Sequence, residues 1–87
     1  PMLYKSLHAG AAAIRNGTTD ASAVQSAMAA VVRREPALTV DYLSMCDPLT
    51  LEPLSIVISK AVLLGAVRLS FIRLIDNLMV TMPAGRR

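Results

Sequence analysis

The sequence predicts an α+β fold in which a two-helix hairpin packs on a small antiparallel sheet of about three strands. The first observation is a change of period, because apolar residues recur every three to four positions early in the chain and later alternate or run together. The second is a pair of apolar runs separated by two residues, which is the spacing of a β-hairpin. The third is the length of 87 residues, which allows one small domain.

Two helices are predicted before Pro36, which forbids continuation. The stripe of the first helix consists of Leu3, Leu7, Ala11 and Ile14, and Asn16–Gly17 supplies its stop. Acceptors for the first N–H groups of the second helix come from 18–20, and its apolar side carries Val24, Met28, Val31 and Val32. The short connection predicts a helical hairpin.

The remaining chain reads as three strands. Residues 38–46 alternate as in a half-exposed strand, and residues 47–55 contain two prolines and form a loop. The apolar runs 61–69 and 72–80 form the hairpin, and residues 83–87 are a tail. Chain order therefore places the three strands in one sheet.

A two-residue turn at Ser70–Phe71 would pair Gly65 with Asp76. Asp76 is then the one polar residue on an apolar face, and we expect it to be a buried anchor accommodated by the missing side chain at Gly65. Arg73 and Asn77 lie on the opposite face. Gly65, Asp76, Arg73 and Asn77 are the predicted structural anchors.

This register has two costs. It sets Arg68 against Arg73, and like charges directly opposite are unfavourable. Ser-Phe is also a poor pair for primed turns, which need positive φ, so a longer irregular loop stays open as the alternative.

Composition limits the function classes. Hydrophobic residues make up 54% of the chain and the mean hydropathy is +0.51, so some apolar surface is meant for a membrane or another piece of protein. The longest apolar run, 56–67, is too short for a span and contains Ser59 and Lys60, so we expect no membrane association. The first residues do not resemble a signal peptide, and Pro1 favours a processed or excised chain.

The charge pattern argues against nucleic acid as a partner. The net charge is only +3, the basic residues are scattered, and the only aromatic residues are Tyr4, Tyr42 and Phe71. The single Cys46 excludes an internal disulfide and fits a reducing, cytoplasmic location.

No catalytic, cofactor-binding or metal site is predicted. His8 is the only histidine and lies on a helix flank, and Cys46 follows an apolar strand with no base nearby. Asp41, Asp47 and Asp76 fall on different faces, and neither metal-ligand spacing nor a glycine-rich phosphate loop occurs.

Two stretches carry a family resemblance. VDYLSMCDPLTLEPL (40–54) and the segment AVLLGAVRLSFIRLIDN (61–77) closely resemble the C-terminal domain of the pantoate–β-alanine ligases, or pantothenate synthetases. The family pattern reads VDY, then D-x-x-T-L-E-P, A-x-R and T-R-L-I-D-N. The chain departs from it at Ser70, where the family has glycine, and at Ile72, where it has threonine.

The resemblance implies a C-terminal cover domain over residues 1–82, whose partner is a missing N-terminal Rossmann-like catalytic domain. In the family that domain holds ATP and Mg²⁺ with a His-x-Gly-His signature and a Ser-Ser-Arg-Asn run, neither of which occurs here. The full-length enzyme joins pantoate to β-alanine through pantoyl adenylate, on the coenzyme A pathway. This segment is then expected to bind neither ATP nor magnesium, to be inactive alone, and to self-associate through exposed apolar surface. The alternative is a stand-alone interaction module derived from that domain.

Overall fold

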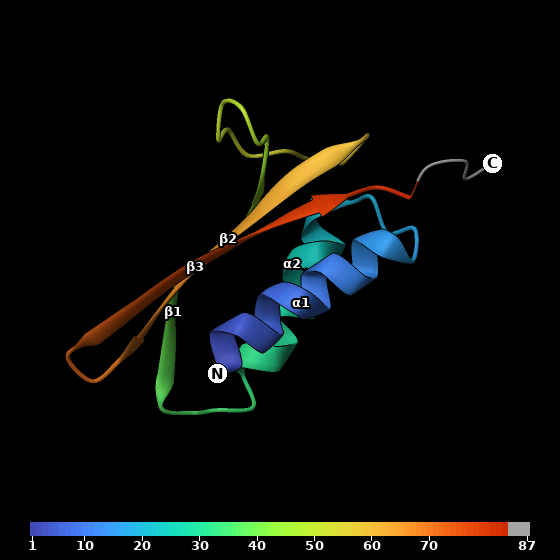
Figure 1. Ribbon diagram of the computed structural model, residues 1–87. Coiled ribbons are helices and arrows are strands. Elements are labelled where there is room, and N and C mark those ends of the chain that lie inside the picture. The colour runs from blue at the N-terminus through green and yellow to red at the C-terminus, as the bar shows by residue number, and fades with distance from the viewer. Residues whose placement is uncertain (84–87) are drawn as a thin grey trace.

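The computed structural model describes residues 1–83 and contains two helices followed by three strands. The elements are α1 (Met2–Arg15), α2 (Ala21–Val32), β1 (Leu38–Cys46), β2 (Lys60–Leu69) and β3 (Ile72–Thr81). The strands form one antiparallel sheet in the order β1-β2-β3, with both helices on the same face (Figure 1). The predicted α+β fold is confirmed, and each strand begins and ends within one residue of its prediction. Of the predicted tail, residues 84–87 lie outside the described part of the chain.

The helix hairpin is closed by the stop and start signals that the sequence predicts. After α1, the N–H groups of Gly17 and Thr18 donate to carbonyls of the last helical turn, each at 2.9 Å, and Gly17 has a φ of +103°. Before α2, the Asp20 carboxylate accepts a hydrogen bond from the N–H of Ala23 at 3.1 Å. Neither helix is long and apolar enough to cross a membrane.

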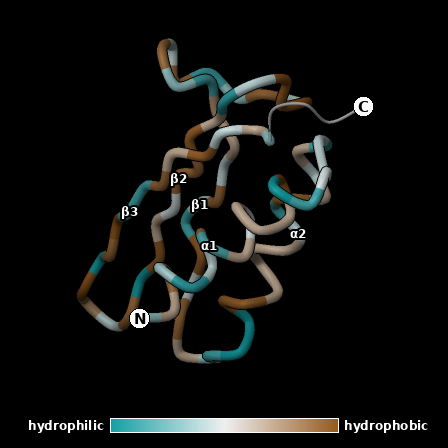
Figure 2. Tube along the Cα trace, turned by 45° about the vertical axis from the view of Figure 1, so that its right-hand side comes forward, coloured by the Kyte–Doolittle hydropathy of each residue, from teal (hydrophilic) through white to brown (hydrophobic). Residues whose placement is uncertain are grey.

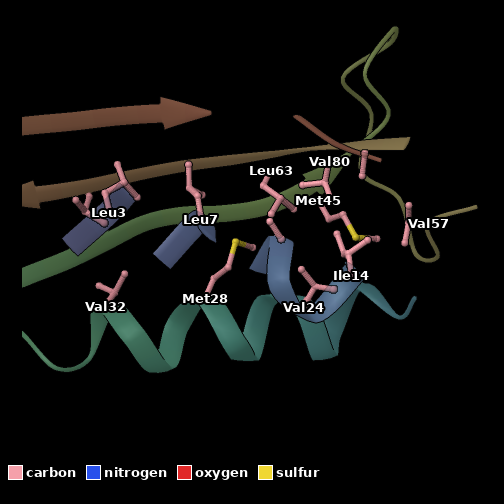
Figure 3. Packing of buried hydrophobic residues seen from close by; sticks show 13 residues of the cluster. Leu3, Leu7, Ile14, Val24, Met28, Val32, Met45, Val57, Leu63 and Val80 are labelled. Atoms are coloured by element: carbon pink, nitrogen blue, oxygen red, sulfur yellow. The ribbon is translucent and has the colours of Figure 1, made fainter. Parts of the chain in front are cut away.

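The hydrophobic core lies between the helices and the covered face of the sheet (Figure 3). Alternation places Gly65 and Leu63 of β2 on this face, and side chains of α1 and α2 fill the space above them. The buried hydrophobic cluster comprises Leu3, Leu7, Ala11, Ile14, Val24, Met28, Val32, Met45, Val57, Ala61, Leu63, Val67 and Val80. The hydroxyl of buried Ser6 donates to the Met28 carbonyl at 2.8 Å and joins α1 to α2.

The hairpin of β2 and β3 has the predicted register. Gly65 lies opposite Asp76, and Arg68 lies opposite Arg73. The connection is a two-residue turn, so the longer loop that we kept as an alternative does not form. Ser70 takes a φ of +57° in this turn, a conformation that glycine adopts more readily.

The two ends of the sheet differ (Figure 1). The hairpin turn lies at one end, and the loop between β1 and β2, residues 47–59, projects from the other. Figure 2 shows apolar residues along the strands and also in this loop. The side chains of Leu49 and Ile58 are 94% and 87% exposed, so part of the surplus hydrophobicity lies on the surface.

Candidate functional site

The polar cluster nearest to the hairpin turn consists of Asp41, Arg68 and Arg73. The Nε of Arg68 lies 3.0 and 3.1 Å from the two carboxylate oxygens of Asp41, and the Nε of Arg73 lies 2.8 Å from Oδ2. The arginine side chains are 58% and 46% exposed, whereas that of Asp41 is 20% exposed. One carboxylate therefore ties β1 to both other strands and offsets the repulsion expected between the two arginines.

A β-bulge brings Asp41 to this position. Val40 pairs with Val67 and Tyr42 with Ala66, so Asp41 is an extra residue with no partner across the strand. Its side chain lies on the face of the sheet that the helices leave open. The pKa of Asp41 is lowered, first by the hydrogen bond from Arg68 and then by that from Arg73, which outweigh the partial burial of the carboxylate.

This cluster was missed at the sequence level. Residues 40–42 belong to the family motif, but the sequence does not predict the register between β1 and β2, and only that register places Asp41 beside Arg68. Alternation from Val40 puts Asp41 on the face of Arg68, and a pairing of β1 with β2 would then have brought the two together. The alternation along β1 thus indicates the face on which Asp41 lies. The length of loop 47–59 does not determine which residue of β2 lies beside it.

Gly65 and Asp76 face one another as predicted, but the reason for the glycine is different. A Cβ at position 65 would lie 2.7 Å from Cδ1 of Leu3, so Gly65 makes room for α1 rather than for a carboxylate. Asp76 is only half-buried, and its Oδ1 accepts the N–H of Asn77 at 2.8 Å. Asn77 is exposed on the open face. The proposed accommodation of a buried Asp76 by Gly65 is therefore corrected.

Asp76 also borders an apolar groove beside the start of α1. It is the one charged side chain among the residues that form the groove: Pro1, Leu3, Tyr4, Leu74, Ile75 and Asp76. No polar cluster accompanies it, so the groove offers contact surface rather than a reacting group.

The remaining candidates lie apart from one another. The ring of His8 packs against that of Tyr4, with 4.2 Å between their centroids. Cys46 is buried, and this burial raises the pKa of its thiol, which disfavours the nucleophilic thiolate. Asp47 accepts the N–H groups of Leu49 and Thr50 at 2.8 and 3.1 Å, so the D-x-x-T sequence is explained by local turn structure.

The structure also shows the surroundings of two glycines and of the potential metal-binding side chains. Within residues 1–83, no group of three or more His, Cys, Asp or Glu side chains is placed to hold a metal ion. Gly10 lies in α1, where an added Cβ would be 2.8 Å from Cγ of Met28, and Gly65 lies within a strand. These glycines serve close packing, whereas a phosphate-binding loop needs exposed backbone N–H groups.

Comparison with known proteins gives one consistent result. Residues 1–79 match the family model described as pantoate-beta-alanine ligase. A pantothenate synthetase from Herpetosiphon aurantiacus is 41% identical over 81 residues, which cover 92% of this chain and 29% of that protein. A bifunctional pantoate ligase/cytidylate kinase from a Synechococcus species is 40% identical over 83 residues, covering 95% of this chain and 15% of that protein.

Solved structures agree with the sequence matches. The crystal structure of pantothenate synthetase from Thermus thermophilus superposes with a TM-score of 0.83 at 35% identity, over 90% of this chain and 28% of that one. The chain thus spans less than a third of the length of these relatives.

Proposed function

Because the chain belongs to the pantoate-beta-alanine ligase family, we propose that it is the C-terminal domain of such an enzyme, or a truncated product of it, and that it covers the active site. One observation carries the proposal. Nine-tenths of this chain superposes on only 28% of the Thermus thermophilus synthetase, which supports a match to one part of a longer protein.

The activity proposed for the longer polypeptide is that of the family. Pantoate is activated by ATP to pantoyl adenylate, and the amine of β-alanine then displaces AMP to give pantothenate. ATP and Mg²⁺ are assigned to the part that precedes this segment, and the enzyme is assigned to the cytoplasm. The single unpaired Cys46 supports the cytoplasmic assignment.

The 87 residues are proposed to be inactive alone. Attack of a carboxylate on the α-phosphate of ATP needs cations and N–H donors that absorb developing negative charge. His8 packs on Tyr4, and Asp41 engages both of the arginines beside it. A cover domain contributes closure and exclusion of water, which accelerate a reaction only over a catalytic domain.

Pyrophosphate release in the presence of pantoate and ATP tests this proposal. The purified chain should give no release above background. Added to the separately produced N-terminal part of the Herpetosiphon aurantiacus relative, it should restore pantothenate formation. Turnover by the chain alone, abolished in His8→Ala, would contradict the assignment.

A stand-alone interaction module is the second candidate, and the exposed apolar side chains of loop 47–59 favour it. The coding sequence upstream of Pro1 separates the two. A reading frame with His-x-Gly-His and Ser-Ser-Arg-Asn signatures supports the ligase, and a start codon directly before Pro1 supports the module.

A further inference from the structure

Arg68 and Arg73 stand side by side on the open face and use only part of their hydrogen-bonding capacity. Each binds Asp41 through Nε. Among the hydrogen bonds of residues 1–83, none involves the Nη atoms of either side chain. Both arginine side chains are about half exposed, which leaves room for a further partner at the Nη atoms.

An accessible Nη edge is suited to an oxyanion. A guanidinium donates two parallel N–H bonds to a carboxylate or phosphate, and a side chain already fixed in place loses less rotamer freedom when it binds. Asp41 fixes Arg68 and Arg73 through one carboxylate. It also cancels one of their two charges, which leaves a net charge of +1. The remaining positive charge attracts an anion such as a carboxylate.

The neighbouring row of the sheet is apolar. Ala66 is buried between Tyr42 on β1 and Ile75 on β3, whose side chains are 37% and 62% exposed. These side chains lie on the open face, one step along the strands from the arginines. A small free anion makes no favourable contact with these apolar side chains. An acidic residue flanked by apolar residues can pair with the arginines and also pack against the apolar row.

We propose that Arg68 and Arg73, held together by Asp41, bind the carboxylate of an Asp or Glu side chain on another protein segment, with Tyr42 and Ile75 contacting apolar residues beside it. The site is independent of the ligase assignment, because it follows from the open face of the sheet alone.

Side-chain Nε–Hε signals in NMR spectra of the full chain test the site directly. The probes are sodium acetate, sodium phosphate and the terminally blocked peptides Leu-Glu-Leu and Leu-Gln-Leu, all at constant ionic strength. Leu-Glu-Leu should shift the Arg68 and Arg73 signals saturably and bind about fivefold more tightly than acetate, because its leucines bury part of the apolar row. Phosphate should bind more weakly than Leu-Glu-Leu, because it makes no contact with the apolar row, and Leu-Gln-Leu should leave both signals in place.

Matched variants separate this site from general charge. Arg73→Gln should abolish the Leu-Glu-Leu shift at Arg68, whereas Arg33→Gln at the end of α2 should leave it unchanged. Asp41→Asn raises the net charge of the cluster to +2 and removes the partner that fixes both arginines, so the preference for Leu-Glu-Leu over phosphate should shrink. The proposal is overturned if neither arginine signal responds, if Arg73→Gln binds the peptide like the original chain, or if phosphate or Leu-Gln-Leu binds as tightly as Leu-Glu-Leu.

Discussion

At Gly65 the space that a side chain on β2 would take is occupied by leucine side chains from α1 and β1. An added Cβ would lie 2.7 Å from Leu3, 3.2 Å from Leu43 and 3.3 Å from Leu7. All three neighbours are leucine side chains, and Leu3 and Leu7 belong to the buried cluster. The absent side chain at Gly65 thus leaves room for the leucines that pack α1 on the sheet.

Gly65→Val should lower the free energy of unfolding by about 2 kcal/mol, because the new methyl groups overpack the leucines. Leu3→Ala removes the nearest of them, so the penalty of Gly65→Val should be clearly smaller in a Leu3→Ala background. Urea unfolding of the four chains measures both values. Equal penalties in the two backgrounds would show that Leu3 is not the obstacle.

Asp41 predicts a dependence of stability on pH. Its pKa is lower in the folded chain than its ordinary value near 4, so its stabilisation is fully present above that value. The stabilisation is lost as the pH falls through the folded pKa. Asp41→Asn, which leaves Arg68 opposite Arg73 without a carboxylate, should therefore lower the melting temperature at pH 7. The difference from the original chain should stay full above the ordinary carboxyl pKa and shrink as the pH falls below it toward the lowered folded pKa. A difference that is constant with pH would contradict the ion-pair explanation.

The hairpin of β2 and β3 forms although its turn sequence is unfavourable. Ten consecutive residue pairs hold the strands in register, from Lys60 with Thr81 to Leu69 with Ile72. This ladder imposes a positive φ on Ser70, which costs a residue with a Cβ about 1 kcal/mol or more. Tertiary pairing thus overrides local turn preference.

Ser70→Gly should raise the free energy of unfolding by about 0.5–1 kcal/mol, because glycine adopts this φ without steric cost. Phe71→Gly is the matched control, since no positive φ is found at Phe71 and its ring is fully exposed. Thermal melts should show stabilisation in the first variant only. Stabilisation by both would indicate a general effect of loop composition.

The molecule as a whole is a two-layer structure with one covered and one open face. The helices cover one face of the sheet, and the open face carries the charged cluster and exposed apolar side chains. Further apolar side chains project from loop 47–59, namely Leu49, Leu51, Ile56 and Ile58. Exposed apolar side chains on this scale favour association.

We expect the isolated chain to form oligomers at high concentration and to bind a dye specific for exposed apolar surface. Leu49→Ser with Ile58→Ser should reduce both, whereas Phe71→Ser at the opposite end of the sheet should change neither. Analytical ultracentrifugation over a range of concentrations provides the measurement. A monomer without dye binding would contradict this expectation.

The sequence by itself determined the elements and the hairpin register. Helix caps act within a few residues, as Gly17 and Asp20 show, and the turn at 70–71 is so short that it leaves one pairing of β2 with β3. The family could likewise be identified from the sequence, because the residues of its motifs occur in this chain with the spacing of the family pattern.

Only the tertiary structure decided the long-range contacts. The pairing of β1 with β2 spans loop 47–59, which specifies no register, and the bulge at Asp41 shifts it by a further residue. The contact of Asp41 with Arg68 and Arg73 follows from that shift. The two arginines, which were expected to repel one another, therefore share one carboxylate. The need for a glycine at position 65 also depends on a long-range contact, because a side chain there would collide with Leu3, which is far away in the sequence. Local patterns set what each segment forms, but packing between distant segments sets which side chains meet.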